Sequence, residues 1–386
     1  MVNQTKQITH KKNTYEFPGQ ITGLKYNAEG SILSVSDTTG KIYLFSDENS
    51  IWGEVENSNQ NENSTLSKSV NSMDFATRGT SSISLLSSNE KAIKLWRIGE
   101  KVVRPCIPQK TASQLLESEW LETTGNQLTL PCLSSKKKQV TAKNVKEFSG
   151  AHQYSIHSVS MSANLENFIS ADDLKVYLWD LNRNDTVCML VDQRECVKPM
   201  NEVITRAVCH PQMSNLILWT STNGTIRVGD LRSKLLCDTP SLTFKCPTPC
   251  TGFFDELMLA ISSAEFCNSR NQIVSRDYFT VKLWDMRITS QPYRIIEVLD
   301  NIEKDMNELY RSQAICAKFQ VKDSPKSEYC ATGGYGEAFV ISYDNPNTCK
   351  YELEPNSNEV LHVDIHPQQT EAALSSSEKL TRVALE

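Results

Sequence analysis

A short strand-like segment recurs along the chain, and this recurrence limits the possible folds more than any other feature. Each copy combines β-branched and aromatic residues with partial alternation, as a β-strand requires. The copies are Lys41–Phe45, Ala92–Trp96, Lys175–Trp179, Thr225–Gly229, Thr280–Trp284 and Glu337–Ile341. An aspartate follows three of them directly: Asp180 and Asp285 follow a tryptophan, and Asp230 follows a glycine in its place. A strand that ends in Trp-Asp is the signature of the four-stranded blade of WD-repeat propellers.

The spacing of these segments indicates the number of blades. Their last residues lie 50 to 57 positions apart, except for one gap of 83 positions between Trp96 and Trp179. Since WD repeats have a period of roughly 40–45 residues, most blades carry a modest insertion and one carries a large insertion. Glu359–Glu386 contains three further strand candidates, and Thr14–Phe17 could supply the missing fourth strand and close the ring. We therefore predict an all-β fold: a seven-bladed WD-repeat β-propeller over residues 14–386, with an inserted arm after the second blade.

Two irregular segments interrupt the repeats. Residues 46–68 are rich in Asn, Ser and Glu, which predicts a flexible polar loop. Residues 97–146 make up the inserted arm, in which we expect a helix over Ala112–Glu122 and a strand-like stretch at Gln127–Pro131. An insertion of this length within a repeat usually projects from one face and contacts a partner.

Composition narrows the classes of partner. The formal net charge of −6 argues against nucleic acid or an anionic membrane, because both attract an excess of Lys and Arg. No apolar run approaches the roughly 18 residues that span a bilayer, and the polar start at Met1–Lys6 lacks the apolar core of a signal peptide. We expect neither nucleic acid nor membrane as a partner, and a cytoplasmic location with a nuclear share left open.

The sequence offers no pattern for catalysis, metal or cofactor. The 12 cysteines are scattered without a CxxC pair, so most should be small core or surface thiols rather than zinc ligands. There is no HExxH, no phosphate-binding loop and no recognisable nucleophile context. Gly333–Gly336 is better explained as a blade turn than as a phosphate site. We therefore expect a non-catalytic binding protein without a cofactor.

Counting back from the strand ends identifies structural residues. Asp172 stands seven residues before Trp179, and Asp277 stands seven before Trp284. A recurring position that accepts hydrogen bonds is typical of a blade turn. His152 occupies the place of the histidine that opens many blades, and we assign it a structural role together with the two aspartates and the two tryptophans.

Non-repeat segments in the middle of the chain carry a more specific signal. They are Ala151–Ser158, Ser170–Lys175, Glu202–Thr205, Gly224–Arg227, Asp230–Ser233, Leu236–Asp238, Phe253–Glu256, Ser275–Tyr278 and Thr332–Tyr335. In this order they resemble the B-family, WD-repeat regulatory subunit of serine/threonine protein phosphatase 2A. The resemblance covers roughly half of the chain, from about His152 to Tyr343.

The resemblance implies a role for the arm and a set of partners. In that family the arm and the nearby bottom face dock onto a helical-repeat scaffold subunit. The top face binds phosphoprotein substrates with basic motifs and presents them to the catalytic subunit. In this chain the arm residues implied to contact the scaffold are Arg104, Pro105, Leu128 and Leu130.

The resemblance also implies a substrate-binding site on the top face. It assigns the gripping carboxylate to Asp173, which can receive an Arg or Lys side chain from a basic motif. The other residues of this implied site are Met200, Tyr154, Tyr335, Val197 and Lys198. The residues themselves leave alternatives open: a plain exposed turn for Asp173, loop packing for Met200, and packing between blades for the tyrosines.

The sequence departs from the family pattern in Asn49–Asp74, where the characteristic acidic and aromatic stretch is not recognisable. The alternative function is therefore a WD-repeat adaptor of another complex, such as the substrate receptor of a ubiquitin ligase. A propeller enzyme would instead be marked by a central channel lined with converging carboxylates or histidines.

Overall fold

The computed structural model describes residues 4–7, 11–46, 51–56, 69–76, 83–103, 106–107, 132–133, 137–183, 186–196, 202–233, 240–246, 258–299, 317–344, 348–352 and 359–385. Strands dominate this part of the chain, with a short helix α1 (Gln193–Cys196) between two of them. No helix among these residues has the length and apolar character needed to cross a membrane.

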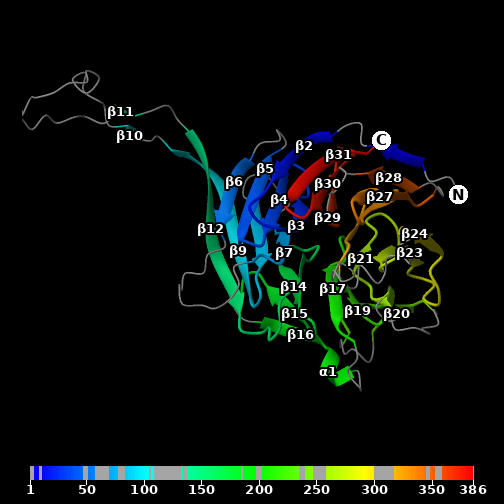
Figure 1. Ribbon diagram of the computed structural model, residues 1–386. Helices are drawn as coiled ribbons and strands as arrows, with labels where there is room; N and C mark the ends of the chain where they lie inside the picture. Colours follow the sequence, from blue (N-terminus) through cyan, green and yellow to red (C-terminus); the bar gives the residue numbers. More distant parts are fainter. Residues whose placement is uncertain are drawn as a thin grey trace, which may run out of the picture.

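Two short strands of the arm, β10 (Cys106–Ile107) and β11 (Cys132–Leu133), pair with each other. The other strands form seven sheets that follow one another around a ring, as Figure 1 shows. Blade 1 contains β3 (Ile21–Tyr26), β4 (Ile32–Asp37), β5 (Lys41–Ser46) and β6 (Ile51–Glu56). Blade 2 contains β7 (Ser72–Phe75), β8 (Ile83–Ser88), β9 (Ala92–Val103) and β12 (Lys137–Ser149). Blade 3 contains β13 (Ser158–Met161), β14 (Asn167–Ala171), β15 (Lys175–Asp180) and β16 (Thr186–Asp192). Blade 4 contains β17 (Ile204–Cys209), β18 (Leu216–Ser221), β19 (Thr225–Asp230) and β20 (Leu242–Lys245).

The last three blades repeat this order. Blade 5 contains β21 (Ser263–Phe266), β22 (Gln272–Arg276), β23 (Thr280–Asp285) and β24 (Arg294–Glu297). Blade 6 contains β25 (Val321–Asp323), β26 (Tyr329–Gly333), β27 (Glu337–Ser342) and β28 (Thr348–Glu352), with β1 (Gln4–Gln7) added in parallel beside β28. Blade 7 contains β29 (Val360–Ile365), β30 (Glu371–Ser376), β31 (Lys379–Ala384) and β2 (Lys11–Glu16). The prediction of a seven-bladed propeller is confirmed.

The ring is closed by strands from the two ends of the chain. The strand β2 pairs antiparallel with β31, with Tyr15 opposite Leu380, and the Phe17 N–H donates to the Glu378 carbonyl at 2.9 Å. The first strands of blades 7 and 1, β29 and β3, lie side by side. The expected closing strand at Thr14–Phe17 therefore lies in and just after β2.

Tryptophan and serine make the same contact in different blades. The Trp179 indole N–H donates to the Ser170 hydroxyl at 2.7 Å, and the Trp284 indole donates to Ser275 at 2.9 Å. Each serine lies on the neighbouring strand of the same blade. Both indoles are almost completely buried, and Phe148 of blade 2 packs edge-on against Trp179 of blade 3 with ring centroids 5.6 Å apart. Because a buried indole needs a hydrogen-bond acceptor, the serine allows these large rings to fill the space between blades.

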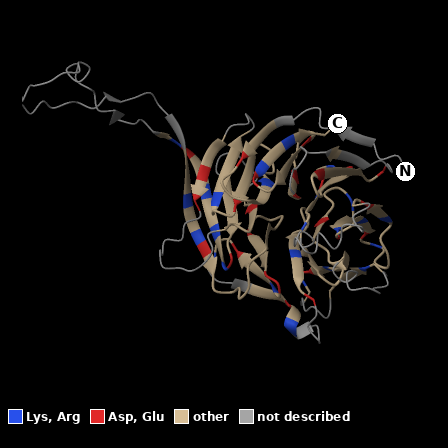
Figure 2. Ribbon diagram, in the orientation of Figure 1, with Lys and Arg blue, Asp and Glu red and all other residues tan. Residues whose placement is uncertain are grey.

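The inserted arm begins as a long extension of blade 2. The strands β9 and β12 pair from Ala92 opposite Ser149 to Val103 opposite Lys137, and side chains of both charge signs occur along this ribbon (Figure 2). Because β12 is the fourth strand of blade 2, the arm lies within that blade, between its third and fourth strands, and not after the blade. The helix expected at Ala112–Glu122 lies outside the described residues.

The prediction of a flexible polar loop over residues 46–68 is wrong for part of that segment. Ile51–Glu56 forms β6, the fourth strand of blade 1, paired with β5. Val55 is buried, and the Trp52 ring is half-buried against the core between blades 1 and 2. The surrounding Asn and Ser residues conceal this short apolar strand in the sequence. Residues 57–68 lie outside the described part of the chain.

Candidate functional site

The turns between the second and third strands of the blades lie at one end of the propeller. The last strand of each blade ends, and the first strand of the next blade begins, at the same end, because successive strands alternate in direction and every blade has the same strand order. We call this end the top face. It carries Asp173 between β14 and β15, Tyr335 between β26 and β27, and Tyr154 between β12 and β13.

A buried hydrogen-bond network fixes the turn that carries Asp173. The Asp172 carboxylate accepts the N–H groups of Leu174 at 2.9 Å and Lys175 at 2.7 Å, and lies 2.9 Å from His152 Nδ1. The other ring nitrogen of His152 lies 2.6 Å from the Ser170 hydroxyl. Burial alone would raise the pKa of Asp172, but these hydrogen bonds hold its pKa below the usual value.

Asp277 has a comparable place in blade 5. Its carboxylate accepts the Thr280 N–H at 2.6 Å and the Thr280 hydroxyl at 2.8 Å, and lies 2.6 Å from the Lys282 ammonium. Asp172 and Asp277 are both buried and bonded within their own turns. They are therefore occupied in shaping the turns, which leaves the next residue, Asp173, in a different chemical situation.

Asp173 presents a half-buried carboxylate at the top face. Its backbone carbonyl accepts the Ile204 N–H of the next blade at 2.8 Å, which fixes the turn. Within the described residues, its carboxylate forms no ion pair and no hydrogen bond. Burial raises the pKa of Asp173, Lys318 opposes that shift, and Asp172 adds to it. Lys318 is an exposed residue just before blade 6, and no repeat or spacing in the sequence marks it as a neighbour of Asp173.

The two tyrosines of the predicted site differ in their surroundings. Tyr154 is 48% exposed and stands in the connection into blade 3. Tyr335 is half-buried, with its hydroxyl 2.6 Å from that of Tyr278 and its ring packed edge-on against Phe319 at a centroid separation of 5.2 Å. Burial and the hydrogen bond with Tyr278 raise the pKa of Tyr335. Tyr335 thus packs between blades 5 and 6, while Tyr154 is exposed to solvent.

Several predicted contacts lie outside the described residues. They are Val197, Lys198 and Met200 of the top face, and Arg104, Pro105, Leu128 and Leu130 of the arm. The segment with Met200 is followed by Glu202, whose buried carboxylate lies 2.7 Å from Arg227 and accepts the Ser221 hydroxyl at 2.9 Å. Glu202 therefore attaches the end of this segment to blade 4.

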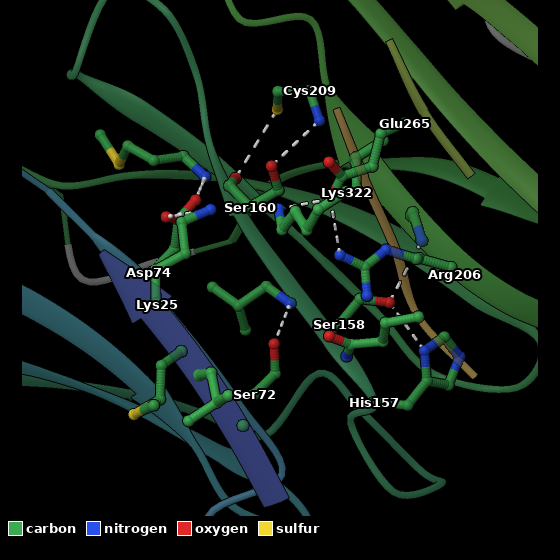
Figure 3. A pocket seen from close by; sticks show the side chains of 18 of the residues that line it. Lys25, Ser72, Asp74, His157, Ser158, Ser160, Arg206, Cys209, Glu265 and Lys322 are labelled. Atoms are coloured by element: carbon green, nitrogen blue, oxygen red, sulfur yellow. Dashed lines mark hydrogen bonds and ion pairs between the residues drawn. The ribbon is translucent and has the colours of Figure 1, made fainter. Parts of the chain in front are cut away.

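A polar cavity of about 220 Å³ occupies the centre of the ring, between the first strands of blades 1 to 6 (Figure 3). Lys25 lies 3.1 Å from Asp74, and Glu265 lies 3.1 Å from Arg206 and 2.5 Å from Lys322. Burial would raise the pKa of Glu265, but the two cations lower it below the usual value. These ion pairs connect neighbouring blades around the channel.

Backbone N–H groups also donate hydrogen bonds to the carboxylates of the channel. Asp74 accepts the Met161 N–H at 2.8 Å, and Asp364 accepts the Tyr26 N–H at 2.6 Å, each across a boundary between blades. Converging carboxylates would be the mark of a propeller enzyme, but these are neutralised by cations and bonded to backbone. No group of three His, Cys, Asp or Glu side chains in the described ranges is arranged to hold a metal ion. The geometry indicates that the channel groups join the blades.

The seven blades and the β9–β12 ribbon define a WD-repeat propeller with an extension of its second blade. Residues 142–180, which span the end of blade 2 and most of blade 3, match the family described as WD domain, G-beta repeat. This match covers the turn with Asp172 and the strand β15, which contains Trp179.

Curated relatives place the chain within one group of WD-repeat proteins. The B-type regulatory subunit of protein phosphatase PP2A from Candida tropicalis is 30% identical over 348 residues, 85% of this chain and 68% of the relative. The protein of the same name from Schizosaccharomyces pombe is 30% identical over 83% of this chain and 73% of its own length. The beta isoform of the 55 kDa B-type regulatory subunit of serine/threonine-protein phosphatase 2A from Carassius auratus is also 30% identical, over 83% of this chain and 76% of its own length. The chain belongs to the family of B-type PP2A regulatory subunits, whose members are non-catalytic regulators, as expected from its sequence.

Proposed function

We propose that this chain targets substrates to a PP2A-type holoenzyme. It binds the helical-repeat scaffold through its arm and bottom face, contacts the catalytic subunit, and holds phosphoproteins with basic motifs at its top face. The single observation that carries this proposal is the half-buried Asp173 carboxylate, which has no described bonding partner and sits on a turn fixed by its buried neighbour Asp172. We place this activity in the cytoplasm, with a nuclear share left open.

The chemistry of Asp173 favours a cationic ligand. A half-buried carboxylate has lost part of its hydration, and an Arg or Lys side chain that binds it replaces the lost water contacts with a charge-assisted hydrogen bond. Tyr154 supplies exposed aromatic surface on the same end of the propeller. Tethering a substrate there raises its effective concentration at the phosphatase without any chemistry by the propeller itself.

The β9–β12 ribbon at the base of the arm is held against blade 1, which fixes its orientation. Trp52 on β6 donates its indole N–H to Glu100 on β9 at 2.9 Å. Val140 and Ala142 on β12 pack against the core between blades 1 and 2. A ribbon held on two blades keeps one orientation relative to the propeller, which suits a segment that docks onto a rigid scaffold.

Affinity purification of the tagged full chain from its own cells, followed by mass spectrometry, tests the proposal. We expect a helical-repeat scaffold and a serine/threonine phosphatase catalytic subunit to be recovered. Deleting residues 104–136, beyond the β9–β12 ribbon, should abolish recovery of both while the propeller keeps its melting temperature. Recovery of ubiquitin-ligase subunits, or of other machinery without a phosphatase, would favour the alternative of an adaptor in another complex.

Substrate recruitment is tested separately with Asp173→Asn. This variant should keep the scaffold and catalytic subunit but lose phosphoprotein substrates, with affinity for basic motifs reduced about tenfold. Glu166→Gln is the matched control, because Glu166 is an exposed carboxylate in the turn between β13 and β14, at the opposite end of the same blade. Equal substrate recovery from both variants would contradict the role of Asp173.

A further inference from the structure

A second cavity opens on the top face, where blades 6, 7 and 1 meet. It has a volume of about 470 Å³, and its lining includes Ile21 and Gln20 of blade 1, Tyr335 of blade 6, and Glu359 and Leu361 of blade 7. Cavities of roughly 300–1,000 Å³ are typical of ligand sites. Asp173 lies in blade 3, so this cavity is separate from the Asp173 turn.

The walls of this cavity are fixed by bonds between the three blades. The Ile21 N–H donates to the Ser377 carbonyl at 2.8 Å, joining blade 1 to blade 7. The Val360 N–H donates to the Gly334 carbonyl at 2.8 Å, joining blade 7 to blade 6. A Cβ atom on Gly333 would lie 1.8 Å from the Val360 carbonyl oxygen, so only glycine permits this close approach. The cavity is therefore built into the fold before any ligand binds.

Glu359 gives the cavity its chemical character. Its carboxylate is half-buried, and burial raises its pKa. Among the residues that the structure describes, no Lys, Arg or His forms an ion pair with it. A carboxylate that is partly removed from water gains most from a cation that reaches it inside the cavity. The apolar side chains of Ile21 and Leu361 in the same lining offer a surface for the methylene stem of such a cation.

We propose that this cavity binds an Arg or Lys side chain of a peptide, with Glu359 as the counter-ion and Ile21 and Leu361 against the aliphatic stem. This inference rests on the proposed function only in taking the peptide to be part of a substrate. The top face then holds two acidic contact points, Asp173 and Glu359, on different blades. A substrate with basic residues at two separate positions contacts both, which raises its affinity and restricts its orientation.

Fluorescence polarisation with the purified full chain tests the cavity directly. The probe is a short fluorescein-labelled peptide of repeated Arg, Ser and Val residues, and its partner is the same peptide with neutral citrulline in place of Arg. We expect the Arg peptide to bind and the citrulline peptide to bind at least about tenfold more weakly. Absence of binding by the Arg peptide, or equal binding of the two peptides, overturns the proposal.

Variants then assign the binding to Glu359. Glu359→Gln should weaken binding of the Arg peptide about tenfold, Glu359→Asp should retain most of the binding, and Glu166→Gln at the opposite end should have no effect. Unchanged binding by Glu359→Gln overturns the proposal, as does an equal loss for both peptides. Asp173→Asn in the same assay tests the other contact point. The two variants therefore report separately on the Asp173 and Glu359 sites. Recovery of the phosphatase from cells is a separate readout, which keeps failure of the proposed function distinct from failure of this cavity.

Discussion

At the scale of single residues, Ser170 and Ser275 occupy equivalent positions but bond different numbers of buried polar groups. Both hydroxyls are buried in the second strand of a blade and accept an indole N–H, at 2.7 Å from Trp179 and 2.9 Å from Trp284. Ser170 also lies 2.6 Å from Nε2 of the buried His152. Removing the Ser170 hydroxyl therefore leaves two buried polar groups without their partner, whereas removing that of Ser275 leaves one.

We expect Ser170→Ala to destabilise the protein about twice as much as Ser275→Ala. An unsatisfied buried donor or acceptor costs about 1–3 kcal/mol, so the losses should be roughly 2–6 kcal/mol for Ser170→Ala and 1–3 kcal/mol for Ser275→Ala. Urea unfolding of the two purified variants beside the parent protein gives the comparison. The alanine has nearly the same volume as serine, so cavity formation contributes little to either value. Equal losses would mean that His152 finds another partner when Ser170 is absent.

At the scale of elements, β6 and β12 show what the sequence can and cannot predict. The third strands recur along the chain, most of them with an aromatic end, and this recurrence is enough to count the blades and to find the closing strand near Tyr15. The fourth strands carry no such recurring residue. Ile51–Glu56 is surrounded by polar residues whose composition predicts a loop, and nothing in the sequence marks β12 as the outer strand of blade 2. Outer strands have one exposed edge and pack on one side, so their apolar pattern is weak.

The same reasoning applies to the top face. The position of Asp173 follows from the resemblance and from counting back to Trp179, because turns repeat with the blades. Lys318 and Glu359 carry no motif, and only the closed ring brings Lys318 near Asp173 and Glu359 into a cavity with Ile21. Residues that meet through ring closure are far apart in sequence. A single sequence read on its own therefore does not predict that they are in contact.

Contact between β6 and β12 gives a prediction about the direction of the arm. A Cβ atom on Gly53 would lie 2.6 Å from a methyl group of Val140, whereas a Cβ atom on Gly99 in the same ribbon would meet nothing within 4 Å. Gly53→Ala should push β12 away from blade 1 and destabilise the protein by about 1–3 kcal/mol. Gly99→Ala is the matched control and should leave stability almost unchanged.

Hydrogen exchange measured by mass spectrometry over residues 137–149 reports on this contact. We expect faster exchange in Gly53→Ala than in Gly99→Ala or the parent protein, together with weaker recovery of the phosphatase scaffold from cells. If exchange rises equally in both variants, the contact between Gly53 on β6 and Val140 on β12 is not what holds the ribbon in place.

At the scale of the whole molecule, two histidines make the ring sensitive to acid. Burial is the main cause that lowers the pKa of His157 to about 4, with Lys318 and Arg206 adding to the effect and Asp172 opposing it. Burial and Arg206 likewise lower the pKa of His362 to about 4. An unfolded histidine titrates near 6.5, so between about pH 6.5 and 4 the unfolded chain binds protons that the folded ring does not.

The contribution of these two histidines to the free energy of unfolding should therefore be complete above about pH 6.5 and should fall as the pH drops toward 4. Urea unfolding between about pH 7 and 5, above the range in which most carboxylates titrate, measures this slope. The double variant His157→Gln, His362→Gln should show a flatter dependence than the parent protein, and each single variant an intermediate one. The same slope in the parent and the double variant would contradict the assignment.

Ring closure makes β2 essential to the last blade. Without β2, blade 7 loses the partner of β31, and the contacts of Tyr15 with Phe45 and of Phe17 with Tyr43, at centroid distances of 4.8 and 4.9 Å, are lost as well. Deleting residues 1–17 should therefore cost at least about 3–5 kcal/mol, the cost of removing one large buried aromatic side chain. The exposed edge of β31 should also promote aggregation.

Deleting residues 1–10 is the control, because it removes β1 but keeps β2. Thermal unfolding and size-exclusion chromatography of the two truncations give the answer: a large drop in melting temperature for the longer deletion alone supports closure by β2, and a similar drop for both would place the stabilising contact in β1 and blade 6 instead.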